Sequence, residues 1–177
     1  MDAAVKPLHA RETSPALTAA LGIAMVAALT LAGAWFFQLV LDIRPCPLCL
    51  EQRYAYYLAI PLGALLAFAA ARDAPRGVLI AGLALLALAA LANAWLGGFH
   101  AGVEWGFWPG PTECTGSAFD PGQAGSLFDN LDRVKVIRCD EVQWRFLGLS
   151  LAGYNVLISL AMAALAGWGI ARTMQPR

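Results

Sequence analysis

The sequence predicts an all-α membrane protein, a bundle of four transmembrane helices, and two observations carry that prediction. Only 14% of the 177 residues are charged and 59% are hydrophobic, whereas a soluble domain carries about 25% charged residues. Four uncharged stretches also pass the roughly 18-residue threshold for a membrane-spanning helix; they cover residues 16–41, 54–71, 77–99 and 146–171. Four buried helices in a soluble chain of this length would leave almost nothing to face water, so we expect one four-span domain over residues 1–177.

The first span is expected to be a retained anchor. Its apolar run is far longer than the roughly 7–15 residues of the apolar core of a signal peptide. The first span ends at Asp42, Arg44 and Pro45, because charged residues leave the apolar run there and proline breaks the helix.

The second and third spans are predicted to be antiparallel neighbours, since only residues 72–76 join them. Alanine and glycine are dense in all four spans, and small residues let membrane helices approach closely. Three polar residues interrupt the spans, and we expect them to bridge helices: Gln38, Asn93 and Asn155.

The loop over residues 100–145 is the largest extramembrane piece, and the shorter loop covers residues 42–53. In the loop over residues 100–145, aromatic residues near the start and Trp144 near the end are expected to anchor the loop at the membrane interface. After a Gly/Pro-rich middle, residues 126–129 resemble a capping box. We therefore predict a short amphipathic helix on the membrane surface here, with a plain surface turn as the alternative.

The four cysteines fall in these two loops, Cys46 and Cys49 in the first and Cys114 and Cys139 in the second. Two spans separate the loops, so both face the same compartment. Four thiols at one membrane face, two of them in a C-x-x-C pair, suit the exchange of disulfides between loops.

The orientation is predicted from the short segments and from redox chemistry. The lysines and arginines divide evenly between the two sides, but short loops weigh more than long ones in the positive-inside rule. Disulfides persist outside the cytosol. We expect the cysteine loops to be periplasmic, both termini to be cytoplasmic, and the protein to lie in a bacterial inner membrane without a nucleic-acid partner.

The C-x-x-C pair has a physical reason to be reactive. It lies at the start of a helix, where the dipole stabilises a thiolate. Arg53 follows Cys49 by one helical turn and can face it, which favours a low thiol pKa at Cys49. A structural zinc site is one alternative, but zinc usually takes paired C-x-x-C motifs or Cys/His clusters. Cys114 and Cys139 are too far apart to form a second such motif, and we predict no metal ligands. A second alternative is a non-enzymatic scaffold with two static disulfides.

The pattern resembles the DsbB family. The resemblance rests on Cys46-x-x-Cys49-x-x-x-Arg53 opening a second span, then Cys114, then Cys139 followed by Gln143-Trp144-x-Phe146-Leu147-Gly148-Leu149. It covers nearly the whole chain. It implies an inner-membrane oxidase that re-oxidises the periplasmic thiol oxidase DsbA, a thioredoxin-fold protein, and passes the electrons to quinone, with ubiquinone favoured and menaquinone as the alternative.

The resemblance also implies roles for individual residues. Cys114 and Cys139 would form the disulfide that reduced DsbA attacks, with Cys114 taking the mixed disulfide. Cys139 would then attack Cys46, and Cys49 would leave and face the quinone. Arg53 matches the arginine that helps to bind and polarise quinone.

The chain departs from the family pattern near the exit of the third span. His100 and Glu104 fall where the family places residues close to the quinone headgroup, and we predict that they contact it, although some members have an amide in place of Glu104. A relative with a substrate other than DsbA is the rival enzyme.

Overall fold

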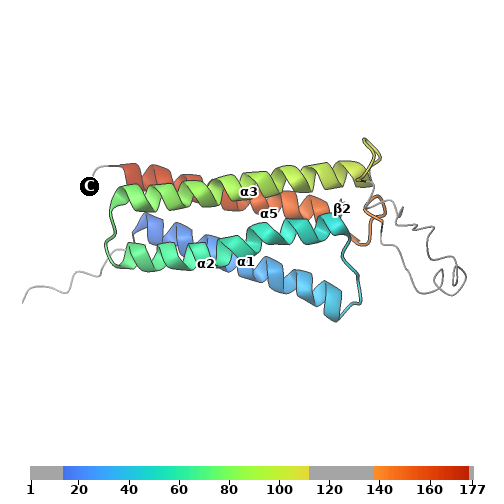
Figure 1. The fold of residues 1–177 in the computed structure, drawn as a ribbon, viewed down its shortest axis with the longest axis horizontal. Helices are drawn as coiled ribbons and strands as arrows, with labels where there is room; N and C mark the ends of the chain where they lie inside the picture. Colours follow the sequence, from blue (N-terminus) through green and yellow to red (C-terminus); the bar gives the residue numbers. More distant parts are fainter. Residues whose placement is uncertain (1–13, 112–137, 176–177) are drawn as a thin grey trace, which may run out of the picture.

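The computed structural model describes residues 14–111 and 138–175, which form a bundle of four long helices (Figure 1). The helices are α1 (Pro15–Leu39), α2 (Pro47–Ala71), α3 (Arg76–Glu104) and α5 (Leu151–Met174). Each is long and apolar enough to cross a membrane. The predicted four-span all-α class is confirmed, while the predicted amphipathic helix near residues 126–134 lies outside the described residues.

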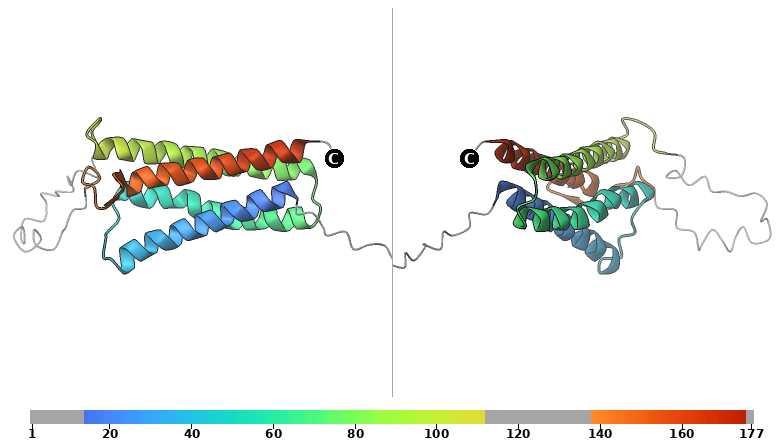
Figure 2. Two further views of the ribbon diagram at one scale, coloured as in Figure 1. Left: turned by 180° about the vertical axis from the view of Figure 1, so that it is seen from behind. Right: turned by 60° about the vertical axis from the view of Figure 1, so that its left-hand side comes forward.

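Helices that follow one another in the chain pack as neighbours, and α5 also packs on α1 to close the bundle (Figure 2). Small residues allow this close packing. A Cβ added at Gly63 of α2 would lie 3.0 Å from the Ala20 carbonyl oxygen, and one added at Gly169 of α5 would lie 2.5 Å from the Ala19 Cβ. Glycine at these two positions therefore sets how closely α2 and α5 approach α1.

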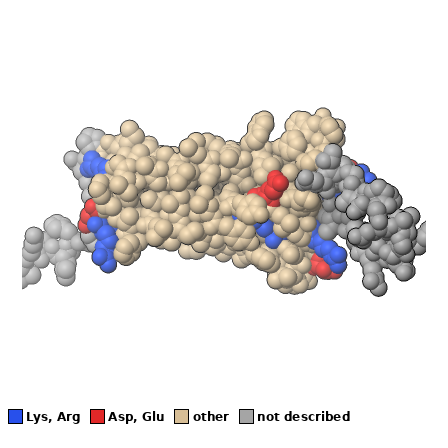
Figure 3. Space-filling model, in the orientation of Figure 1, with Lys and Arg blue, Asp and Glu red and all other residues tan. Residues whose placement is uncertain are grey.

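Polar side chains inside the spans bridge helices, as predicted. The Nδ2 atom of Asn93 in α3 donates to Asn155 Oδ1 in α5 at 3.2 Å, and Gln38 of α1 accepts a hydrogen bond from Arg53 of α2. The outer surface is apolar instead. Figure 3 shows the charged side chains of one face gathered toward the two ends of the bundle, with a broad uncharged band between them.

Two helix starts differ from the apolar runs. Helix α2 begins at Pro47, ahead of the apolar run at residue 54, because proline is favourable at the first position and the Cys46 side chain caps the helix. Helix α5 begins at Leu151 rather than at residue 146. A small hairpin precedes it, in which β1 (Arg145–Phe146) pairs antiparallel with β2 (Leu149–Ser150).

The hairpin explains that later start. Leu147 and Gly148 both have positive φ, at 48° and 84°, and two such residues make the tight turn that joins antiparallel strands. Ser150 then caps α5 by accepting a hydrogen bond from the Gly153 amide at 3.2 Å. Helix α3 in turn runs past residue 99 to Glu104, so residues 100–104 are helical instead of forming the start of the loop.

Candidate active site

The C-x-x-C pair opens helix α2, and its two sulfurs face each other. Cys46 is the N-cap residue and accepts a hydrogen bond from the Cys49 amide at 3.2 Å. The two Sγ atoms are 2.7 Å apart, and a disulfide needs about 2.05 Å, so a small approach joins them. The hydrogen bond that Cys46 donates to the Cys49 sulfur, together with burial, raises the pKa of Cys46. The proton that the pair shares therefore stays on Cys46.

A third cysteine reaches the same place from the far loop. Cys139 is 1% exposed and belongs to one buried cluster with Cys46, Leu48 and Val103. It is disulfide-bonded, whereas Cys46 and Cys49 are free. Cys114 lies outside the described residues. The structure thus brings three of the four predicted cysteines to one end of the bundle.

His100 approaches the pair from α3, on the side of Cys46. Its Nε2 atom lies 3.6 Å from the Cys46 Sγ, and its Nδ1 atom lies 2.9 Å from the Gln52 Nε2. With the Gln52 amide nitrogen facing the ring, Nδ1 accepts this bond and the ring proton is on Nε2, pointing at the sulfur. The ring also interacts with the backbone of Cys139.

Glu104 follows His100 by one helical turn. One carboxylate oxygen lies 4.0 Å from His100 Nε2, and the other accepts a hydrogen bond from the Ser150 hydroxyl. Glu104 therefore ties the end of α3 to the start of α5 behind the cysteine pair.

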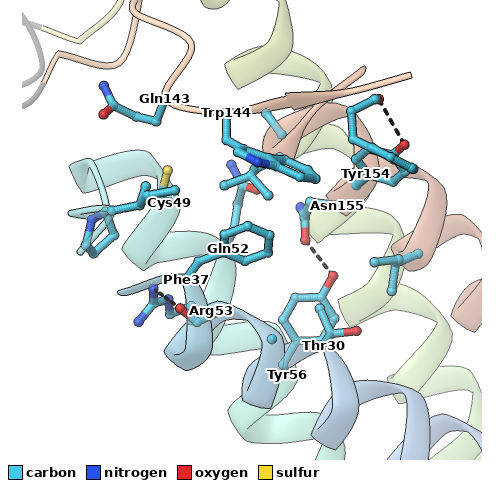
Figure 4. A pocket seen from close by; sticks show the side chains of 18 of the residues that line it. Thr30, Phe37, Cys49, Gln52, Arg53, Tyr56, Gln143, Trp144, Tyr154 and Asn155 are labelled. Atoms are coloured by element: carbon cyan, nitrogen blue, oxygen red, sulfur yellow. Dashed lines mark hydrogen bonds between the residues drawn. The ribbon is translucent and has the colours of Figure 1, made fainter. Parts of the chain in front are cut away.

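A cavity of about 380 Å³ lies on the other side of the pair (Figure 4). It is lined by α1, α2, α5, residues 43–45 and three residues before α5, Gln143, Trp144 and Phe146, and its wall is mostly apolar. Cys49, Gln52 and Arg53 contribute polar atoms from α2, and Asn155 contributes from α5. This volume is in the range of small-molecule sites. Neither His100 nor Glu104 lines it, so their contact with a quinone stays a prediction.

Arg53 is held at the cavity wall by α1. Its Nη1 donates to Gln38 Oε1 at 2.8 Å and its Nη2 to the Ala34 carbonyl at 3.4 Å. The guanidinium also lies 5.5 Å from the centre of the Trp35 ring. Only 9% of Arg53 is exposed, so these contacts offset the cost of burying its charge. A guanidinium has five N–H donors, and the two bonds that Arg53 donates leave N–H groups for a further acceptor.

Aromatic rings line the cavity next to the hairpin. The Trp144 ring lies 4.9 Å from that of Phe37 and is stacked on Phe146 at 5.9 Å between centroids. Trp144 also lines the cavity, while its predicted role as an interface anchor stays a prediction. Its position depends on the hairpin that precedes α5.

Three further lining residues were not singled out as site residues from the sequence: Gln52, Tyr56 and Phe37. The spacing in α2 could have indicated Gln52 and Tyr56, because they follow Cys49 by three and seven residues and so share its helix face. Tyr56 donates to Asn155 Oδ1, and Asn155 is held by Asn93, so a polar cluster forms the inner end of the cavity. No comparable spacing pointed to Phe37, which comes from another helix.

Comparison with known proteins agrees with this geometry. Residues 16–169 match the family described as "Disulfide bond formation protein DsbB". A protein from Azoarcus sp. (strain BH72) named Disulfide bond formation protein B is 35% identical over 152 residues, covering 80% of this chain and 84% of that protein. A protein of the same name from Hahella chejuensis is 32% identical, covering 81% and 86%. No solved structure matches the chain. The chain belongs to the DsbB family of membrane disulfide bond formation proteins.

Proposed function

We propose that this protein re-oxidises a periplasmic DsbA-like thioredoxin-fold protein and passes the electrons to a membrane quinone, with ubiquinone favoured over menaquinone. One observation carries the proposal. The C-x-x-C pair lies between a buried, disulfide-bonded cysteine on one side and an apolar cavity with a buried arginine on the other. An oxidase of this kind needs one route for thiols and another for electrons, on opposite sides of its redox pair.

The thiol route is a series of exchanges between disulfides. A thiolate of the reduced partner attacks the Cys114–Cys139 disulfide, forming a mixed disulfide with Cys114 and releasing Cys139 as a thiolate. Cys139 then attacks the Cys46–Cys49 disulfide at Cys46, and Cys49 leaves as a thiolate. Each exchange breaks one S–S bond and forms another. The second thiolate of the partner finally displaces Cys114, which attacks Cys139 and frees Cys46. The burial of Cys139 in one cluster with Cys46 supports the second exchange.

The electron route is the cavity, and its residues fit a quinone headgroup. The mostly apolar wall suits a flat carbonyl-bearing ring, the aromatic rings of Phe37 and Trp144 line it, and the Cys49 sulfur opens onto it. A bound quinone would accept the two electrons of the dithiol. Arg53 would bind a carbonyl oxygen and stabilise negative charge there, since it is a fixed cation in a site with little water.

The dithiol loses two protons as it closes to a disulfide. Cys46 keeps its proton in the free pair, and the nearest described ring nitrogen is His100 Nε2. We propose that His100 and Glu104 belong to the active site on its α3 side. Their predicted contact with the quinone is still to be tested.

We also propose that the cysteine end of the bundle is periplasmic in a bacterial inner membrane. The start of α2, which carries the C-x-x-C pair, lies at one end of the bundle, and the α2–α3 turn and the end of α5 lie at the other (Figure 1). Arg72, Arg76 and Arg172 fall at that second end, as expected for a cytoplasmic face.

The thiol route is tested by trapping its intermediate. Removing Cys139 should leave the partner joined to Cys114, because the resolving sulfur is absent. Cys114 of a Cys139→Ala variant is first converted to its mixed disulfide with thionitrobenzoate. A reduced DsbA-like protein that keeps only its attacking cysteine should then displace thionitrobenzoate and give a complex that a reductant dissolves. A Cys114→Ala, Cys139→Ala variant treated in the same way should give none. If no thioredoxin-fold partner is trapped, a scaffold with static disulfides is the better account.

A further inference from the structure

The buried end of the C-x-x-C pair has a third potential metal ligand that the sequence does not connect to it. The Sγ atoms of Cys46 and Cys49 and a ring nitrogen of His100 all lie within 4.8 Å of one another. Cys46 and His100 are almost fully buried, at 1% and 3% exposed. Two sulfurs and one imidazole nitrogen form a donor set that favours zinc.

The spacing fits tetrahedral zinc after a small movement. Zinc bonds of about 2.3 Å to sulfur and 2.0–2.1 Å to nitrogen place a sulfur and a nitrogen ligand about 3.6 Å apart. Cys46 Sγ and His100 Nε2 are 3.6 Å apart. The two sulfurs, 2.7 Å apart, would have to separate by about 1 Å, which a rotation of the half-buried Cys49 side chain provides.

The surroundings orient the histidine as metal sites do. A metal-bound histidine usually bonds through its second ring nitrogen to a neighbouring group, and His100 Nδ1 lies 2.9 Å from the Gln52 amide. An amide can turn to present its oxygen, so Gln52 can accept Nδ1–H and leave Nε2 free for a metal. The Cys49 amide already donates to the Cys46 sulfur, so a Cys46 thiolate formed when a metal displaces its proton keeps a hydrogen-bond donor.

A fourth ligand is also within reach. Glu104 Oε1 lies 4.0 Å from His100 Nε2, and its other oxygen is held by Ser150. The carboxylate is not among the groups that lie within 4.8 Å of one another, so a water completes four-coordinate zinc unless the Glu104 side chain moves closer.

We infer that the reduced protein binds one Zn²⁺ through Cys46 Sγ, Cys49 Sγ and His100 Nε2. Binding releases the two thiol protons, because the ligands are thiolates. Oxidation of the pair to a disulfide removes two of the three ligands, so the metal binds only the reduced state. Bound zinc occupies both sulfurs and keeps them from rejoining, which makes the site a reversible, redox-dependent block. The sequence predicted no metal ligands, since it gave no reason to place a histidine of the third span against the first loop.

The test measures metal binding directly and does not depend on the proposed oxidase activity. A Cys114→Ser, Cys139→Ser protein leaves only the C-x-x-C thiols. Reduced and freed of reductant without air, it is titrated with Zn²⁺ against a chromophoric chelator, and with Co²⁺ to detect thiolate-to-metal absorption. We expect one metal per chain, and none at this site after the pair is oxidised.

Two variants assign the ligand. His100→Gln in this background should weaken zinc binding by about 100-fold, and Gln52→Leu by about 10-fold. The chain has two histidines, His9 and His100, and His9→Gln is the matched control that should bind as the parent does. Each variant must still form the Cys46–Cys49 disulfide on oxidation, which shows that the site has folded. Equal affinity in the parent and His100→Gln, or equal binding by the reduced and oxidised parent, would overturn the inference.

Discussion

Replacing Arg53 with methionine tests the electron route most sharply, because it removes the guanidinium but keeps an unbranched side chain that fills part of the same space. Two hydrogen bonds hold Arg53 in the cavity wall, so its position is fixed before a ligand binds. A hydrogen bond from a charged donor contributes about 1.5–3 kcal/mol. Losing one to a quinone carbonyl should lower kcat/KM for quinone by roughly 10- to 150-fold.

The assay follows quinone absorbance at several quinone concentrations, with reduced DsbA in excess. Arg72→Met is the matched control, since it makes the same change at the opposite end of the same helix, where the guanidinium lies 4.8 Å from the centre of the Phe68 ring. When Cys139→Ala is added to either variant, the trapped complex between Cys114 and DsbA should form normally. If Arg53→Met keeps the kcat/KM of the wild type within about twofold, Arg53 does not act on quinone and the reasoning fails.

Three other predictions concern stability and thiol reactivity. Asn155→Leu should lower the free energy of unfolding by about 1–3 kcal/mol, since buried hydrogen-bond partners are left unpaired; an unchanged thermal midpoint in detergent would contradict this. Gly169→Val should cost about 1–3 kcal/mol by overpacking, whereas Gly167→Val, where an added Cβ meets nothing within 4 Å, should cost little in the same unfolding experiment. In the reduced protein, the raised pKa of Cys46 keeps its thiol protonated at neutral pH, so iodoacetamide should modify Cys49 first and reach Cys46 faster as pH rises; equal rates at neutral pH, read by mass spectrometry, would argue against this assignment of the proton.

The sequence predicted the four helices well because a helix that crosses lipid must be a long, predominantly apolar run of residues. It predicted their ends less well. Helix α2 starts at Pro47 through a sulfur cap, and that signal is not hydrophobic. Helix α5 starts late because Leu147 adopts a positive φ of 48° in a hairpin turn. This conformation is uncommon for leucine, so the sequence does not predict it.

The site was predictable wherever its residues are neighbours along one helix. The turn-to-turn relation of Cys49 and Arg53 could be read from their spacing, and both line the cavity. The contact of His100 with Cys46 spans 54 residues of sequence and depends on how α3 packs beside α2. No local pattern encodes that packing. The resemblance to the DsbB family placed His100 near the quinone, which stays a prediction, and the structure adds its contact with the Cys46 sulfur.

In the proposed mechanism, electrons leave the dithiol through Cys49 into the cavity. The most direct measurement follows the absorbance of ubiquinone when the purified protein is mixed with reduced DsbA, beside a Cys49→Ala variant. We predict that quinone is consumed only when both DsbA and Cys49 are present. Consumption that persists in Cys49→Ala, or no consumption with either ubiquinone or menaquinone, would contradict the claim.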